Sequence, residues 1–146
     1  MSGITRKQAL DVIRNEWATY VKGFQIFSPA VQAKFLSRQG YGSLSALLAH
    51  ILAWWEDGQR VIISLQDDPG FAPPDYDMDA FNAQAVARFQ SWSEPSILDA
   101  FEQERASWVS FIENLPASTF QNQHIAHRLY MELVFHLDEH ALSPEK

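Results

Sequence analysis

Residues 43–66 read SLSALLAHILAWWEDGQRVIISLQ, and this stretch indicates the fold class. Each residue of an α-helix turns about 100° around the axis. By that count four other apolar residues lie within about 40° of Leu47, so that five residues form one stripe. Ser43 is a suitable N-cap, while Gly58 costs a helix interior about 1 kcal/mol relative to alanine. The stretch predicts one long amphipathic helix. The residues of its stripe are Leu47, Ile51, Trp54, Val61 and Leu65.

Helical spacing of apolar residues recurs along the rest of the chain, and no stretch alternates as a strand does. Thr5 and Gln8 match a capping box, and Pro95 suits the first turn of a helix that follows a break at 93–95. We expect helices at 5–22, 44–66, 78–92, 95–114 and 123–142, with a short helical turn at 29–37. The fold class predicted is all-α, a four-helix bundle with a broken crossing segment before the last helix.

The composition bounds both the architecture and the partners. A length of 146 residues suggests one domain, 1–146, and a hydrophobic content of 47% suffices for a core. The net charge is −7 without any basic cluster, so nucleic acid is not an expected partner. Cysteine is absent, which excludes disulfides, thiolate ligands and a cysteine nucleophile.

The location of the protein is predicted from its apolar segments. The most apolar stretch, ALLAHILAWW (46–55), has about half of the roughly 20 residues that a membrane span requires. The first ten residues contain no apolar core of the kind that a secretory signal has. We therefore expect a cytoplasmic protein without a membrane segment.

Three of the five histidines fall on inward-facing stripes. His136 and His140 lie about 40° apart on the predicted last helix, and His50 lies about 60° from Leu47 on its own helix. His124 and His127 lie on other faces and are expected to face solvent or a helix end. The sequence thus predicts a cluster formed by His50, His136 and His140.

The chemistry of such a cluster favours a transition metal. Imidazoles at positions i and i+4 stand about 5–6 Å apart at Cβ and can occupy two corners of one coordination sphere, with the third ligand coming from another helix. Three neutral nitrogens suit Zn²⁺ or Ni²⁺, and three protein ligands leave a position open, as in catalytic sites. The alternative remains open that these are hydrogen-bonded core histidines, or histidines favoured at a helix C-terminus.

Other residues are candidates for supporting roles. Glu132 and Asp57 are placed to orient an imidazole or to act as a base. Trp54, one turn after His50, is a candidate pocket wall, whereas most of the other tryptophans are expected in the core. Asn82 either binds substrate or bridges helices. The segment DDPGFAPPDYD (67–77) is either a crossing loop or a lid.

The segment GYGSLSALLAHILAWWEDG together with the later HLDEH resembles the DinB/YfiT-like superfamily of metalloenzymes. That family has one histidine early in its second helix and an HxxxH in its last, and His50, His136 and His140 match these positions. Glu139 matches a frequent acidic residue before the last histidine. The resemblance spans essentially the whole chain. It implies a four-helix bundle with a three-histidine metal site.

The middle segment, residues 75–116, is similar to the ClbS/DfsB branch of this superfamily, in which an asparagine follows an aromatic residue as Asn82 follows Phe81. That branch often lacks the second histidine of the HxxxH, whereas this chain keeps both. This difference from the ClbS/DfsB branch favours a member of the superfamily that binds a metal.

The resemblance implies activities of a broad kind. Characterised relatives include metal-dependent transferases and isomerases that use low-molecular-weight thiols such as bacillithiol, mycothiol or glutathione, and others protect against genotoxins. The function expected here is activation of a small thiol or water for transfer or hydrolysis on a small molecule, in detoxification or stress. The alternatives are a non-catalytic protective protein of the ClbS/DfsB kind and a structural bundle that forms a homodimer.

Overall fold

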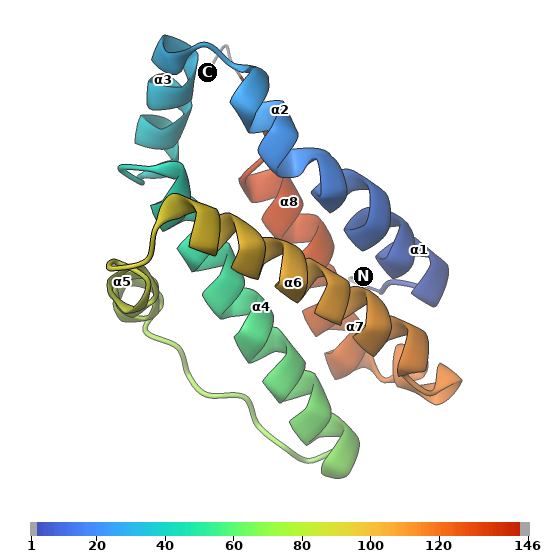
Figure 1. The fold of residues 1–146 in the computed structure, drawn as a ribbon. Coiled ribbons are helices and arrows are strands. Elements are labelled where there is room, and N and C mark those ends of the chain that lie inside the picture. Colours follow the sequence, from blue (N-terminus) through green and yellow to red (C-terminus); the bar gives the residue numbers. More distant parts are fainter. Residues whose placement is uncertain (1–2, 144–146) are drawn as a thin grey trace.

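The computed structural model describes residues 3–143, which form an all-helical bundle without a strand. Four long helical segments lie alongside one another, and shorter helical elements flank them (Figure 1). The long segments are α1 (Arg6–Asp11) continued through η1 (Val12–Glu16), η2 (Trp17–Thr19) and α2 (Tyr20–Ile26), then α4 (Leu44–Asp67), α6 (Glu94–Asn114), and α7 (Gln123–Tyr130) continued through η4 (Met131–Phe135) and α8 (His136–Glu139). The short ones are α3 (Pro29–Gln39), α5 (Met78–Arg88) and the 3₁₀ turn η3 (Ala117–Gln121).

Side-chain caps set the helix starts where the sequence indicated them. Thr5 and Gln8 form the predicted capping box, and the Ser43 hydroxyl accepts the Ala46 amide at 3.1 Å. Ser93 caps α6 with Pro95 in its first turn. These contacts confirm the predicted starts of three helices.

Four predicted boundaries were wrong. The helix expected at 123–142 ends at Glu139, because His140 leaves the helical conformation with a φ of −105° and a ψ of 19°. The turn expected at 29–37 is the full helix α3, because Ser28 caps it and Pro29 occupies its first turn. The first helical segment continues to Ile26 rather than ending at 22. The helix expected at 78–92 ends at Arg88, where Phe89 turns into the core.

Helix α4 lies at the centre of the bundle and contacts α3, α5, α6, α7 and η4. Its neighbours on several sides explain why its buried residues extend well beyond one stripe. The indole rings of Trp17 and Trp55 meet edge to face at 4.9 Å, and Trp108 is equally buried. The prediction that most tryptophans lie in the core is confirmed for these three, whereas Trp92 is 45% exposed.

Two π-helical turns interrupt the long segments at the same level of the bundle, where η1 contacts η4. In η4 the His136 amide donates to the Met131 carbonyl five residues earlier. The indole N–H of Trp55 donates to the Glu132 carbonyl at 3.1 Å, and that of Trp17 to the Leu133 carbonyl at 2.9 Å. These buried donors stabilise the wide turn that directly precedes His136.

None of the described helices combines the length and the apolar character needed to cross a membrane.

Candidate metal centre

The three histidines predicted to cluster do so in the structure. His50 lies near the start of α4, whereas His136 begins α8 and His140 directly follows its last residue. Each is at most 7% exposed, so all three are buried. One nitrogen from each ring lies within 4.8 Å of the others, which is close enough for the three to hold one metal ion.

The ring atoms that converge are the three Nε2 atoms. His50 Nε2 lies 3.0 Å from His140 Nε2 and 3.2 Å from His136 Nε2. A metal–nitrogen bond of about 2.0–2.1 Å separates two bound nitrogens by about 3.3 Å at the tetrahedral angle and about 2.9 Å at a right angle. The observed spacings therefore fit a common ion in either geometry.

Burial keeps the imidazoles neutral, the form that binds metals. It lowers the pKa of His50, and burial with the nearby His50 lowers the pKa of His140 to about 3. Burial, together with the nearby His140 and His50, lowers the pKa of His136 well below its ordinary value. Protonation of the cluster is thus disfavoured at neutral pH.

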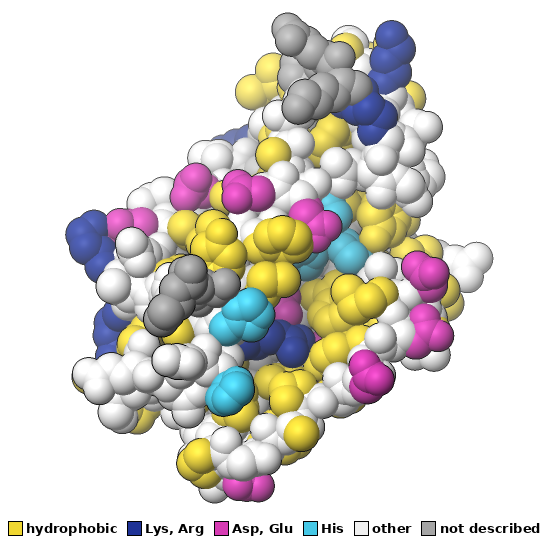
Figure 2. Space-filling model, turned by 180° about the vertical axis from the view of Figure 1, so that it is seen from behind, with side chains coloured by type: hydrophobic (Ala, Val, Ile, Leu, Met, Phe, Trp, Pro, Cys, Tyr) yellow, Lys and Arg dark blue, Asp and Glu magenta, His cyan; other side chains and the backbone are white. Residues whose placement is uncertain are grey.

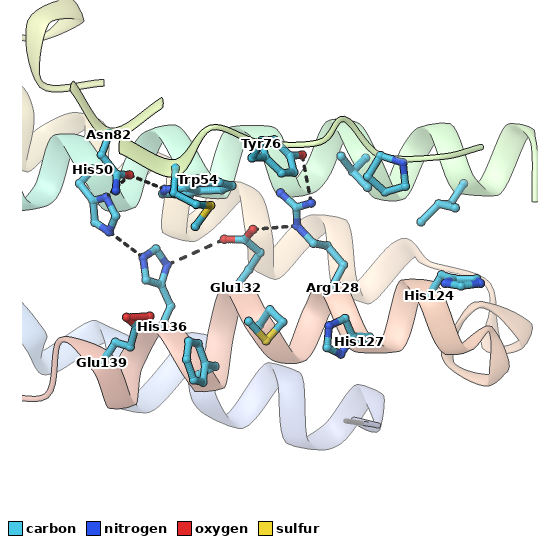
Figure 3. Close-up of a pocket in the computed structure, with 16 residues that line it drawn as sticks. His50, Trp54, Tyr76, Asn82, His124, His127, Arg128, Glu132, His136 and Glu139 are labelled. Atoms are coloured by element: carbon cyan, nitrogen blue, oxygen red, sulfur yellow. Dashed lines mark hydrogen bonds and ion pairs between the residues drawn. The ribbon is translucent and has the colours of Figure 1, made fainter. Parts of the chain in front are cut away.

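Amide side chains from two other helices hold the outer edges of two imidazoles. His50 Nδ1 lies 2.9 Å from Asn82 Oδ1, and His140 Nδ1 lies 2.6 Å from Gln39 Oε1. The Asn82 contact to His50 is visible in Figure 3. Gln39 is the last residue of α3, where Gly40 ends the helix with a φ of 85°, a left-handed conformation that suits glycine.

A group of charged side chains begins one helical turn from the cluster, at Glu132, and continues to Arg128 and Asp57. Arg128 donates to Glu132 at 2.8 Å and to Asp57 at 2.9 Å, and Tyr76 donates to the same Asp57 carboxylate. Burial raises the pKa of Glu132 to about 8, although the Arg128 guanidinium favours its carboxylate form. Hydrogen bonds from Tyr76 and Arg128 lower the pKa of Asp57 despite its burial.

The two carboxylates proposed to support an imidazole are placed differently. Glu132 Oε1 lies 3.8 Å from His136 Nδ1, a buried nitrogen with no hydrogen-bond partner among residues 3–143 (Figure 3). Asp57 binds Arg128, Tyr76 and Arg60, and among the described residues it reaches no imidazole. Of the two, Glu132 is therefore the carboxylate beside the cluster, and Arg128 joins Asp57 to it.

Gly58 explains how Glu132 fits beside α4. A Cβ added at Gly58 would lie 2.7 Å from Glu132 Cγ, closer than such contacts occur. The glycine that the helix carries at some energetic cost thus leaves the space in which the Glu132 side chain lies.

The cluster opens into a pocket of about 450 Å³. His50, His136, Glu132 and Arg128 line it among mostly apolar walls, and the space-filling view shows histidine and arginine side chains in a hollow bordered by hydrophobic residues (Figure 2). The apolar lining includes Trp54, Val61, Leu65, Pro73, Met131 and Phe135.

The structure places the remaining candidates around this pocket. Trp54 forms one wall of the pocket, and Asn82 both lines the pocket and bridges α5 to α4. His124 and His127 are exposed and outside the cluster, as expected, yet they line the outer part of the pocket (Figure 3). Pro73 and Tyr76 show that the 67–77 segment forms part of the pocket wall.

Sequence reasoning missed Gln39, Arg128 and Tyr76. Arg128 had a signal that was not used, because it lies four residues before Glu132 and eight before His136 and therefore on the same side of the predicted helix. Gln39 had an indirect one, because the following Gly40 predicts a helix end at that point. No spacing pattern marked Tyr76.

No protein-family model matches the chain, and neither the curated proteins nor the solved structures contain a match to it. What the site can do chemically is therefore inferred from its own geometry.

Proposed function

We propose that the protein is a metal-dependent enzyme in which His50, His136 and His140 bind one divalent ion, Zn²⁺ or Ni²⁺. The observation that carries the proposal is the convergence of three buried Nε2 atoms at 3.0 and 3.2 Å. Neutral nitrogen donors of this number suit these ions better than Mg²⁺ or Ca²⁺. The match of the same three residues to the DinB/YfiT-like pattern supports the assignment.

A bound ion with an open position would lower the pKa of a thiol or water molecule and so supply a thiolate or hydroxide at neutral pH. The chain's own residues provide the surroundings for that chemistry. The Glu132 carboxyl lies on the outer side of His136, 3.8 Å from its Nδ1, and Arg128 holds this carboxyl in place. Trp54, Met131 and Phe135 enclose the approach to the cluster in apolar surface.

The substrate we propose is a small, largely apolar molecule, with a low-molecular-weight thiol as the co-substrate. The apolar walls and the cavity volume of about 450 Å³ are in the range of small-molecule sites. Transfer of the thiol to a reactive compound would place the protein in detoxification.

A second candidate function is favoured by the extent of the pocket. It runs from His50 along α7 to His124, well beyond the space that an ion and one thiol need. A non-catalytic protein that binds a toxic small molecule in this pocket is the alternative.

Activity measurements separate the two functions. Protein loaded with Zn²⁺ or Ni²⁺ is mixed with bacillithiol, mycothiol or glutathione and an epoxide, and thioether formation is followed. The enzyme is expected to accelerate it, and His50→Ala to abolish the acceleration while His127→Ala retains it. A binder would instead show epoxide-induced thermal stabilisation that survives chelation, with no acceleration for any of the thiols.

A further inference from the structure

We propose that Asn82 and Gln39 are positioning residues that fix the tautomers of His50 and His140. Each amide oxygen accepts the imidazole Nδ1–H and leaves the opposite Nε2 without a proton. The purpose of this arrangement rests on the proposed metal site, because an unprotonated Nε2 is the atom that binds an ion. The tautomers themselves are a property of the chain and can be measured without any metal.

The identity of the Asn82 atom follows from Trp54. The indole N–H can only donate, and it lies 2.8 Å from Asn82 Oδ1. The atom that it contacts must therefore be the amide oxygen rather than the nitrogen. The same oxygen lies 2.9 Å from His50 Nδ1, so this ring nitrogen must be the donor and carry the proton.

The orientation of Gln39 is fixed in a similar way. Its Nε2 donates to the Glu139 backbone carbonyl at 3.3 Å, and a carbonyl oxygen can only accept. The Gln39 oxygen is then the atom 2.6 Å from His140 Nδ1, which must donate to it. Both amides thus assign the imidazole proton to Nδ1.

The consequence is an unfavourable contact that a cation relieves. With both protons on Nδ1, the unprotonated Nε2 atoms of His50 and His140 face each other at 3.0 Å. Two lone pairs at this distance repel, and an ion between them turns both into ligands. His136 differs, because its Nδ1 has no hydrogen-bond partner among residues 3–143 and its tautomer is not fixed in this way.

Helix α5 holds Asn82 in position through the pocket wall. Asp77 caps the helix, and Phe81, the residue before Asn82, stacks on Trp54 with ring centroids 3.9 Å apart. Trp54 therefore contacts both the ring beside Asn82 and the amide itself. The same residues form the wall of the substrate pocket and orient one histidine of the cluster.

The test is long-range ¹⁵N–¹H NMR of the histidine rings in metal-free protein at neutral pH, with His50→Ala and His140→Ala to assign the signals. We expect both rings in the Nδ1–H form. Asn82→Leu should shift His50 alone towards the Nε2–H form, and Gln39→Leu should shift His140 alone. Asn82→Asp keeps an acceptor at this position and should preserve the wild-type tautomers. It therefore serves as the control that the shift in Asn82→Leu comes from the lost acceptor and not from loss of folding.

Metal titration provides the second readout. Loss of an outer hydrogen-bond partner weakens metal binding about 10–100-fold, so Asn82→Leu and Gln39→Leu should each bind Co²⁺ that much more weakly. Gln84→Leu, on an exposed position of the same α5, should bind as the wild type does. An Nε2–H tautomer for His50 and His140 in the metal-free wild type, or unchanged tautomers in the leucine variants, overturns the inference. Correct tautomers in a protein that binds no metal would instead refute the proposed function and leave the inference standing.

Discussion

At Gly58, helix propensity favours alanine, whereas the space that the Glu132 side chain needs favours glycine. Alanine in a helix interior is favoured over glycine by about 1 kcal/mol, but here its Cβ would lie 2.7 Å from Glu132 Cγ. Crowding of a packed interior costs about 1–3 kcal/mol, which exceeds the gain of about 1 kcal/mol from helix propensity. Gly58→Ala should therefore lower the free energy of unfolding by about 1 kcal/mol in urea titrations.

The control is the same change in a Glu132→Ala background, where the space is free. There Gly58→Ala should raise the free energy of unfolding by up to about 1 kcal/mol through helix propensity alone. Destabilisation of equal size in both backgrounds would contradict the role given to Gly58.

Glu104 is expected to make stability depend on pH. Burial, together with the negative charge of Glu56, raises the pKa of Glu104 to about 7. The folded state therefore binds a proton more tightly than the unfolded state, and stability from this group is lost as pH rises from about 4.5 to 7. Glu104→Gln should remove this loss, so its stability relative to the wild type should increase between pH 5 and pH 8. Parallel pH profiles of the two proteins in urea titrations would show that Glu104 does not titrate in this way.

At the scale of the element, the junction of α3 and α4 depends on one backbone conformation. Gly40 has a φ of 85°, which costs other residues about 1–2 kcal/mol. Gly40→Ala should lower the free energy of unfolding by about 1 kcal/mol, measured by thermal unfolding. Gly42→Ala is the matched control, because Gly42 lacks a positive φ and a Cβ there meets nothing within 4 Å. An equal loss in both variants would contradict the account.

The helices were largely predictable because caps and apolar spacing are local. Ser43, Thr5 and Pro95 mark their helix starts directly in the sequence. The π-helical turns were not predictable in this way. The turn before His136 is stabilised by indole donors from Trp17 and Trp55, which lie on other helices and far away in the sequence.

In the whole molecule, the site was predictable only in part, because part of it depends on contacts between helices that are far apart in the sequence. The angular positions of His50, His136 and His140 follow from helix geometry and place all three on inward faces, whereas the level at which they meet depends on how the helices pack. Their outer partners do not follow, since the pairing of Asn82 with His50 or of Gln39 with His140 depends on how α5 and α3 pack. The resemblance to a family pointed to the three histidines and to Asn82, but it indicated neither the contact of Asn82 with His50 nor the role of Gln39.

Metal removal should destabilise the whole bundle, because the cluster joins α4 to α8. An ion that binds only the folded state at a free concentration 100 times its dissociation constant adds about 2.7 kcal/mol of stability. Dialysis against a chelator should therefore lower the Tm of the wild type, and re-addition of Zn²⁺ should restore it. The Tm of His136→Ala should not respond to the chelator, and an equal response would indicate that metal acts elsewhere.

Elemental analysis of the protein purified without a histidine tag tests the metal centre most directly. We expect about one equivalent of Zn²⁺ or Ni²⁺ per chain in the wild type and in His127→Ala, whose side chain lines the pocket outside the cluster. His50→Ala, His136→Ala and His140→Ala should each lose most of it. A wild type without bound metal that also takes up none from added Zn²⁺ or Ni²⁺, or a metal content that these three substitutions leave unchanged, would contradict the account.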